Sequence, residues 1–156
     1  MTIDRKNQIV SVDRVIPATP EQIFELLVDP RNHSAFDGSG TVKAANISAP
    51  TRLSLGAKFG MDMKMGPSYK IQNEVVEFVE GKQIAWRHQG HHVWRYMLEP
   101  VAGGTKVTEQ FDYAKMRAKI VLYVLRSIPK NEKSMIKTLE NLEKHFAGNY
   151  AAQNPS

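Results

Sequence analysis

Apolar and polar residues alternate through the middle of the chain, which is the period of a strand with one buried face. Five segments show this pattern, and Gly- or Pro-containing turns separate them. They run over residues 58–65, 69–75, 84–88, 94–98 and 107–113. Because consecutive strands joined by short turns pair in antiparallel fashion, the pattern predicts a meander that buries one face.

Two helical signals and one further strand precede this meander. Residues 8–16 are rich in Val and Ile and predict a strand, although its two faces are equally apolar and neither is assigned to the core. Thr19, Pro20 and Gln22 then supply an N-cap, a first-turn proline and a capping box. That helix is expected to stop before Pro30, and residues 30–37 predict a second, short helical segment.

A long amphipathic helix is expected at the C-terminal end of the chain. It is predicted to open at Pro129 and to reach about residue 147, with Gly148 as its C-cap and residues 149–156 as a frayed tail. Its apolar stripe has spacings of 4, 3 and 4 and consists of Met135, Leu139, Leu142 and Phe146. A strand meander with one such helix predicts an α+β protein in which the helix covers the sheet.

Composition limits the remaining choices. The chain has 156 residues, enough for one core, and we expect a single domain over residues 1–156. It has no cysteine, which excludes disulfides, thiolate zinc sites and thiol nucleophiles. Its longest apolar run, residues 120–125, is far shorter than the ~20 residues that span a bilayer. With no signal-peptide pattern in the first residues, we expect a cytoplasmic protein.

Positive charge is concentrated in one part of the chain. Residues 115–144 hold eight basic and three acidic residues, whereas the whole chain has a net charge of +5. Within this region, residues 115–130 combine an apolar segment with basic flanks. One interpretation is a lid or a transient contact with an anionic membrane, and the other is a short helix packed on the sheet edge. The basic region could equally meet an acidic partner or be a solvated helix face.

A strongly curved sheet under a single helix is hard to fill completely. The inward phase of the meander carries large aromatic side chains and three methionines, Met61, Met63 and Met65. These side chains form either a solid core or the adaptable wall of an apolar pocket for a small molecule.

The order and spacing of several short motifs resemble one superfamily. The motifs occupy residues 16–24, 27–30, 75–77, 81–87, 94–100, 103–109 and 139–143. Together, over about residues 8–147, they are similar to the START and birch-pollen-allergen-like superfamily, or SRPBCC, in its polyketide cyclase/dehydrase and lipid-transport branch. The resemblance implies a helix-grip fold, namely a curved antiparallel sheet of about seven strands around a long C-terminal helix, with two short helices after the first strand. It also implies an internal cavity for a hydrophobic ligand, but it does not fix an activity.

The residues expected to contact such a ligand share the inward phase of a strand or lie on a helix that faces the sheet. They are Phe36, Phe59, Met61, Met63, Tyr69, Ile71, Asn73, Trp86, His88, Trp94, Tyr96, Glu109, Phe111, Tyr113, Met135, Leu139 and Leu142.

Three of these residues are candidates for proton transfer, namely His88, Glu109 and Tyr113. Glu109 shares the phase of Phe111, and a buried carboxylate is costly unless it is paired or protonated. It therefore either contacts the ligand or is turned outward by a bulge. His88 is either a polar group of the cavity or an ordinary hydrogen-bonded histidine. Asp37 is either at the pocket mouth or a turn residue before Gly38.

Other chemistries receive no support from the sequence. His91 and His92 are adjacent and would point to opposite faces of a strand, so no metal site is expected. No nucleophile elbow, dinucleotide-binding loop or phosphate-binding loop occurs, so no cofactor is implied. Nucleic-acid binding is disfavoured because the aromatic residues share the core phase rather than an exposed basic face.

Three classes of function remain. The first is non-catalytic binding or transport of a lipid- or polyketide-like molecule. The second is a cyclase/dehydrase-type enzyme that uses an acid or base in the cavity. The third is an interaction protein that uses its basic C-terminal third. The sequence leaves the ligand, the reaction and the oligomeric state open.

Overall fold

A computed structural model of the chain describes residues 2–45, 49–64, 67–120, 123 and 126–153. Within these residues, eight strands form one antiparallel sheet in the order β1-β2-β8-β7-β6-β5-β4-β3. The strands are β1 (Thr2–Asp4), β2 (Ile9–Ile16), β3 (Val42–Ala45), β4 (Lys58–Lys64), β5 (Ser68–Val79), β6 (Gln83–His88), β7 (Val93–Val101) and β8 (Gly104–Asp112). The expected α+β helix-grip fold with about seven strands is confirmed.

The two outermost strands, β1 and β3, are additions to the predicted set. They span three and four residues, too few for an alternating pattern to be recognised in the sequence. β5 is longer than expected and contains a register shift between Val75 and Glu77, as a β-bulge produces. Met65, assigned to the inward face of β4 from its phase, lies outside the described residues.

The helices between β2 and β3 follow the predicted signals. α1 (Pro20–Val28) begins after Thr19, whose hydroxyl accepts from the backbone N–H of Gln22 at 3.2 Å. The Gln22 side chain accepts in return from the Thr19 N–H at 2.9 Å, which completes the capping box. The 3₁₀ helix η1 (Pro30–Asn32) and α2 (His33–Phe36) follow.

The C-terminal helix is longer at both ends than predicted. α4 (Ser127–Gln153) starts two residues before Pro129, so the proline lies within its first turn. It also continues through Gly148, which is therefore not a C-cap, and part of the predicted tail is helical. Nothing lies within 4 Å of a Cβ built on Gly148, and one such glycine weakens a helix by about 1 kcal/mol without ending it. Of the apolar segment 116–125, residues 121–122 and 124–125 lie outside the described set.

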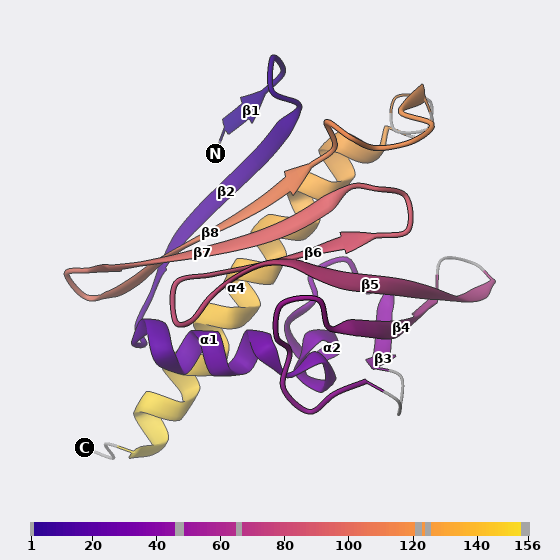
Figure 1. The fold of residues 1–156 in the computed structure, drawn as a ribbon. Coiled ribbons are helices and arrows are strands. Elements are labelled where there is room, and N and C mark those ends of the chain that lie inside the picture. The colour runs from indigo at the N-terminus through magenta and orange to yellow at the C-terminus, as the bar shows by residue number, and fades with distance from the viewer. Residues whose placement is uncertain (1, 46–48, 65–66, 121–122, 124–125, 154–156) are drawn as a thin grey trace.

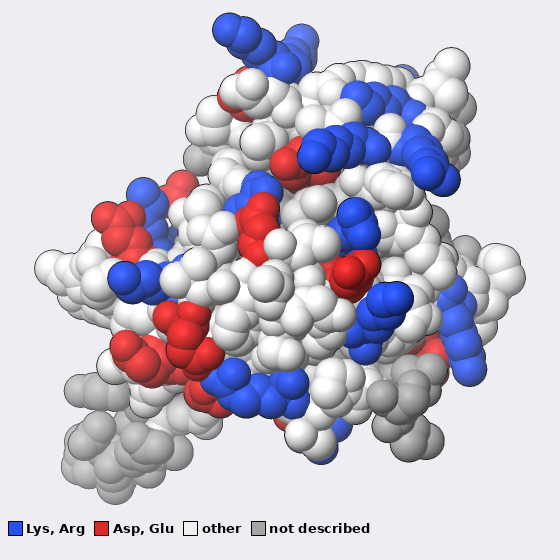
Figure 2. Space-filling model, in the orientation of Figure 1, with Lys and Arg blue, Asp and Glu red and all other residues white. Residues whose placement is uncertain are grey.

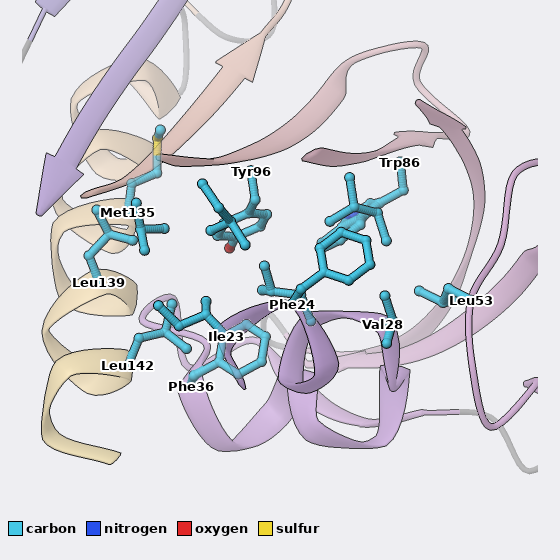
Figure 3. Close-up of a cluster of buried hydrophobic side chains, with 14 of the residues drawn as sticks. Ile23, Phe24, Val28, Phe36, Leu53, Trp86, Tyr96, Met135, Leu139 and Leu142 are labelled. Carbon is cyan, nitrogen blue, oxygen red and sulfur yellow. The ribbon is translucent and has the colours of Figure 1, made fainter. Parts of the chain in front are cut away.

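The helices cover the inner face of the sheet unequally (Figure 1). α4 lies against β2 and β8, near one edge, whereas α1 contacts β6 and β7. α2 bridges β3 and α4. Figure 3 shows Leu139 and Leu142 of α4 directed toward the apolar side chains of α1 and α2. Within the described residues, the longest helix, α4, therefore lies beside the middle strands rather than over them.

The outer face of the sheet is polar. Arg95 donates to both carboxylate oxygens of Glu77 at 2.7 Å each and lies 3.6 Å from Asp112. Its side chain is only 15% exposed, so this pair is better shielded from solvent than an ordinary surface ion pair. Figure 2 shows basic and acidic side chains interleaved on the face in view. No helix in the described part of the chain has the length and apolar character needed to cross a bilayer.

Candidate functional site

A cavity of about 640 Å³ lies between the sheet, α2 and the first half of α4. Its lining residues come mainly from α2, the loop that follows it, strands β3 to β8 and α4, whereas α1 supplies none. They are His33, Phe36, Asp37, Ser39, Thr41, Val42, Phe59, Met61, Met63, Tyr69, Ile71, Asn73, Trp86, His88, His92, Trp94, Tyr96, Glu109, Phe111, Met116, Ser127, Lys130, Asn131, Ser134, Met135 and Thr138. Ser39 and Lys130 are solvent-exposed, so the cavity is open to solvent on the side of these lining residues.

Aromatic rings form the central wall of the cavity. Trp86 pairs with Trp94 across β6 and β7, and Trp94 pairs with Phe111 across β7 and β8. The centroids of the Trp94 and Phe111 rings are 4.7 Å apart. Because inward residues of neighbouring strands lie side by side, the three form one row across the sheet.

Glu109 lies on the inner face, as its phase indicated, and is 4% exposed. Its Oε1 accepts from the Tyr96 hydroxyl at 3.0 Å, while Oε2 has no hydrogen-bond partner among the described residues. Burial raises the pKa of Glu109 to about 8, the Tyr96 hydrogen bond opposes the rise, and the charge of Asp37 adds to it. At neutral pH the group is therefore mostly a carboxylic acid that can donate a hydrogen bond into the cavity.

A second polar group of residues lies on the other side of the aromatic row. Asn73 pairs with His88 across β5 and β6 and is 3% exposed. The ring of His92 stacks on that of His88, with centroids 4.5 Å apart. Oδ1 of Asn73 and Nδ1 of His92 have no partner within the described part of the chain. Burial, with a smaller contribution from charge repulsion by His88, lowers the pKa of His92 to about 3.

His92 lies in the turn between β6 and β7, two residues before Trp94, and lines the cavity as Trp94 does. His91 adopts a left-handed backbone conformation with φ of 66°, which is uncommon for a residue other than glycine. His91 and His92 point to different sides, because His92 lines the cavity whereas His91 lies in a separate surface pocket with Lys58 and Arg87. The residues that the structure describes contain no group of three potential ligands arranged to hold a metal ion.

His33 was not predicted as a site residue. Its Nε2–H donates to the Leu27 carbonyl at 2.8 Å, and its ring stacks on Trp86 at 4.8 Å. Burial lowers the pKa of His33 to about 4, so the ring is neutral at physiological pH. Nothing in the sequence distinguishes a histidine in a four-residue helix from a surface histidine. His33 is buried only because α2 lies under the sheet.

Most of the side chains expected to contact a ligand line the cavity. These are Phe36, Phe59, Met61, Met63, Tyr69, Ile71, Asn73, Trp86, His88, Trp94, Tyr96, Glu109, Phe111 and Met135. Tyr113, Leu139 and Leu142 are buried but are not among the lining residues. Tyr113 lies past the end of β8, where its N–H bonds the Gln8 carbonyl. Leu139 and Leu142 lie farther along α4, in the core beside α1 and α2 (Figure 3).

Residues 36–38, at the end of α2 and just after it, form hydrogen bonds to α4 at the edge of the cavity. The Gly38 N–H donates to the Thr138 hydroxyl at 2.9 Å, and the Asn141 amide donates to the Phe36 carbonyl at 3.2 Å. A Cβ on Gly38 would lie 2.2 Å from the Ser134 carbonyl oxygen, so only glycine permits this approach. Asp37 combines its two predicted roles, because it lines the cavity and accepts from Ser39 in the turn.

These observations define a helix-grip protein with a partly open internal cavity that has an apolar wall and few polar groups. Residues 7–147 match the family model described as "Polyketide cyclase / dehydrase and lipid transport". The chain belongs to this family, within the SRPBCC superfamily that its motifs resembled.

Two curated relatives come from Mycobacterium tuberculosis strains. "Uncharacterized protein Rv0088" is 39% identical over 105 residues, which cover 66% of this chain. "Uncharacterized protein MT0096" is 38% identical over the same length. The matched region spans 46% of the length of each relative.

Solved structures resemble the fold at low sequence identity. Protein NE0264 from Nitrosomonas europaea has a TM-score of 0.70 at 16% identity, covering 96% of this chain and 99% of the other. Protein Ms6760 from Mycobacterium smegmatis has a TM-score of 0.68 at 16% identity, and the match covers 98% of this chain and 97% of the other. The Aha1 dimer from Colwellia psychrerythraea has a TM-score of 0.60 at 13% identity, with 88% and 95% covered. At these identities the likeness shows the fold alone.

Proposed function

We propose that this protein binds a hydrophobic or aromatic small molecule, lipid- or polyketide-like, in the cavity and acts as a binding or transport protein. The main support is the cavity of about 640 Å³ with its aromatic wall. Its size falls within the ~300–1,000 Å³ typical of small-molecule sites, which are mostly apolar with a few placed polar groups. The family membership supports the same class of ligand without specifying one.

Filling the cavity should abolish binding of an apolar probe. Ile71 is buried and lines the cavity, whereas the next residue of β5, Gln72, is exposed. We expect Ile71→Trp to weaken the binding of N-phenyl-1-naphthylamine at least about tenfold, because the indole occupies ligand space. Gln72→Trp, which adds the same ring outside, should leave the affinity unchanged. The measurement is a titration followed by the fluorescence of the probe.

The proposal fails if folded Ile71→Trp and Gln72→Trp variants bind the probe equally well. Native mass spectrometry of gently purified protein gives a second readout, since a co-purifying lipid or aromatic compound would reveal the class of ligand. A co-purifying compound that Ile71→Trp excludes would support binding in the cavity.

A second candidate is an acid/base enzyme of cyclase/dehydrase type. The supporting observation is the buried carboxyl of Glu109, whose Oε2 lacks a partner in the described residues and whose pKa is raised by burial to about 8. Such a group could protonate a ligand carbonyl and recover the proton later. Glu109→Gln or His88→Gln should then lower turnover by about a hundredfold or more while a ligand still binds. Catalysis is excluded if compounds that bind the wild-type protein remain unchanged on long incubation.

Contact with an anionic membrane through residues 115–130 is a further proposal. Met116, Ser127 and Lys130 line the cavity, while Ile120 and Tyr123 expose their side chains. An apolar exposed surface with basic flanks next to a cavity would suit ligand exchange with a bilayer. Ile120→Ser with Tyr123→Ser should reduce co-flotation with phosphatidylserine-containing vesicles severalfold. Equal flotation of wild type and variant would count against this contact.

A further inference from the structure

The inner surface of the sheet has an ordered arrangement of polar and aromatic residues. Register places Tyr96 opposite Glu109 and Trp94 opposite Phe111, and His92 comes two residues before Trp94 in the chain. The backbone N–H of His88 donates to the His92 carbonyl at 3.0 Å, and His88 pairs with Asn73. The order along the cavity is thus a polar group at Glu109, an aromatic row, and a polar group at Asn73 and His92.

The separation between the polar groups follows from strand geometry. Successive inward residues of a strand are about 7 Å apart. Tyr96 and His92 are four residues apart in the chain, so the two polar groups are separated by about 14 Å along the strand direction. Glu109 on β8 and Asn73 on β5 are also three strands apart, whereas His92, just before β7, is only one strand away from Glu109. Trp94, which forms part of the wall with Trp86 and Phe111, lies between them.

Each polar group has an unused hydrogen-bonding atom. Glu109 and Asn73 are more than nine-tenths buried, and Glu109 Oε2 and Asn73 Oδ1 lack partners among the described residues. A buried polar atom without a partner costs about 1–3 kcal/mol, so a ligand that supplies the missing partner gains affinity and one that cannot is rejected. His92 Nδ1 adds a third such atom beside Asn73.

The charges around the cavity disfavour an anionic ligand at either group. The charged side chains that line it are Asp37, Glu109 and Lys130. The lysine is exposed, whereas the carboxyls of Asp37 and Glu109 lie close enough for Asp37 to raise the pKa of Glu109. Near Asn73, the histidines are neutral because burial lowers the pKa of both His88 and His92. A fatty-acid carboxylate would therefore find no buried cation among the described lining residues.

We propose that the ligand is a neutral, elongated, aromatic molecule with a polar group at each end. One end carries a hydroxyl or carbonyl group that binds Glu109, and the other carries a hydroxyl group that donates to Asn73 Oδ1 beside His92. Its aromatic body lies against Trp86, Trp94 and Phe111. This inference rests on the proposed function, because it specifies the chemistry of the ligand in the same cavity. It selects a polyhydroxylated or keto aromatic compound over a fatty acyl chain.

A matched set of stilbenes tests the ligand chemistry. The probes are trans-4,4′-dihydroxystilbene, its dimethyl ether, unsubstituted trans-stilbene and stilbene-4,4′-dicarboxylate. Trp86 and Trp94 are the two tryptophans of the chain and both line the cavity, so quenching of their fluorescence reports binding. We expect the diol to bind at least about tenfold more tightly than stilbene and the dimethyl ether, and the dicarboxylate to bind most weakly.

Variants of the protein test the assigned residues. Asn73→Leu and Glu109→Leu should each weaken binding of the diol about five- to tenfold and leave stilbene affinity unchanged or improved. Gln72→Leu, at the outward neighbour of Asn73, is the matched control and should change neither affinity. If a cavity variant fails to fold, the wild-type protein still tests the inference. The inference then requires that the wild-type protein binds the diol more tightly than its dimethyl ether.

The outcomes separate this inference from the proposed function. Equal binding of diol and stilbene, or tightest binding of the dicarboxylate, overturns the inference while leaving a hydrophobic ligand in the cavity. Equal loss of diol and stilbene binding in both leucine variants overturns it as well. If neither the stilbenes nor N-phenyl-1-naphthylamine bind, the proposed function itself fails.

Discussion

The Glu109→Gln variant is expected to remove a loss of stability that the wild-type protein shows between about pH 6.5 and 9. The pKa of Glu109 is about 8 in the folded protein, raised chiefly by burial, against an ordinary value of 4.5. Between these values the folded state keeps a proton that the unfolded state has released. Stability therefore falls as the pH rises through this window and becomes constant above it.

Three histidines determine the part of the pH window in which the Glu109 effect can be measured alone. Burial lowers the pKa values of His33 and His92 to about 4 and about 3, and it also lowers the pKa of His88. Below pH 6.5 the unfolded state gains protons at these residues, so stability falls with decreasing pH and opposes the Glu109 effect. From pH 6.5 to 8 the pH dependence of stability comes mainly from Glu109. Over these 1.5 pH units the release of its proton on unfolding lowers the free energy of unfolding by about 2 kcal/mol.

Urea unfolding followed by tryptophan fluorescence at pH 6.5, 7.5 and 9 measures this effect. The wild type should lose about 2 kcal/mol over the range, and the difference between wild type and Glu109→Gln isolates the contribution of the buried carboxyl. Glu99→Gln, at an exposed position on β7, is the control and should follow the wild type. A Glu109→Gln profile parallel to that of the wild type would mean that the carboxyl is ionised in the folded state.

Gly38→Ala is expected to destabilise the protein by about 2–4 kcal/mol. The added Cβ would lie 2.2 Å from the Ser134 carbonyl oxygen and 2.4 Å from the Thr138 nitrogen. Both are backbone atoms of α4, so the helix or the loop has to move and the hydrogen bond between Gly38 and Thr138 is lost. Because Ser134 and Thr138 also line the cavity, affinity for N-phenyl-1-naphthylamine should fall too.

Gly148→Ala provides a matched control with the opposite sign. Gly148 lies in α4 with nothing within 4 Å of a built Cβ, so alanine should stabilise the helix by up to about 1 kcal/mol. Thermal or urea unfolding of both variants provides the comparison. Equal stability of Gly38→Ala and wild type would contradict the close backbone contact between the α2–β3 segment and α4.

Much of the candidate site was predictable because the period of a strand is local. Once one inward residue of β8 is fixed, Val107, Glu109 and Phe111 must share a face. The same holds for Trp86 with His88 and for Trp94 with Tyr96. The phase of β8 thus put a carboxyl on the apolar side, but it could not decide between a cavity contact and an outward bulge. That choice depended on the unbroken pairing of β8 with β2 and β7.

Other features were missed because they depend on contacts between distant parts of the chain. His33 is buried only because α2 lies beneath Trp86. Leu139 and Leu142 share the apolar stripe of Met135, yet Met135 alone of these three lines the cavity. The stripe determines which side of the helix is buried but not which strands it covers.

The sequence by itself determined the order of the main elements, the inward face of the central strands and the chemistry of the side chains on that face. These follow from local periodicity, caps and turn residues, which act within a few positions of the chain. Only the tertiary structure decided that α4 lies over β2 and β8, held by Gly38 and Thr138, rather than over the middle of the sheet. The space beside the helix depends on that placement, because a cavity is the volume that packed elements leave unfilled and no local pattern encodes it.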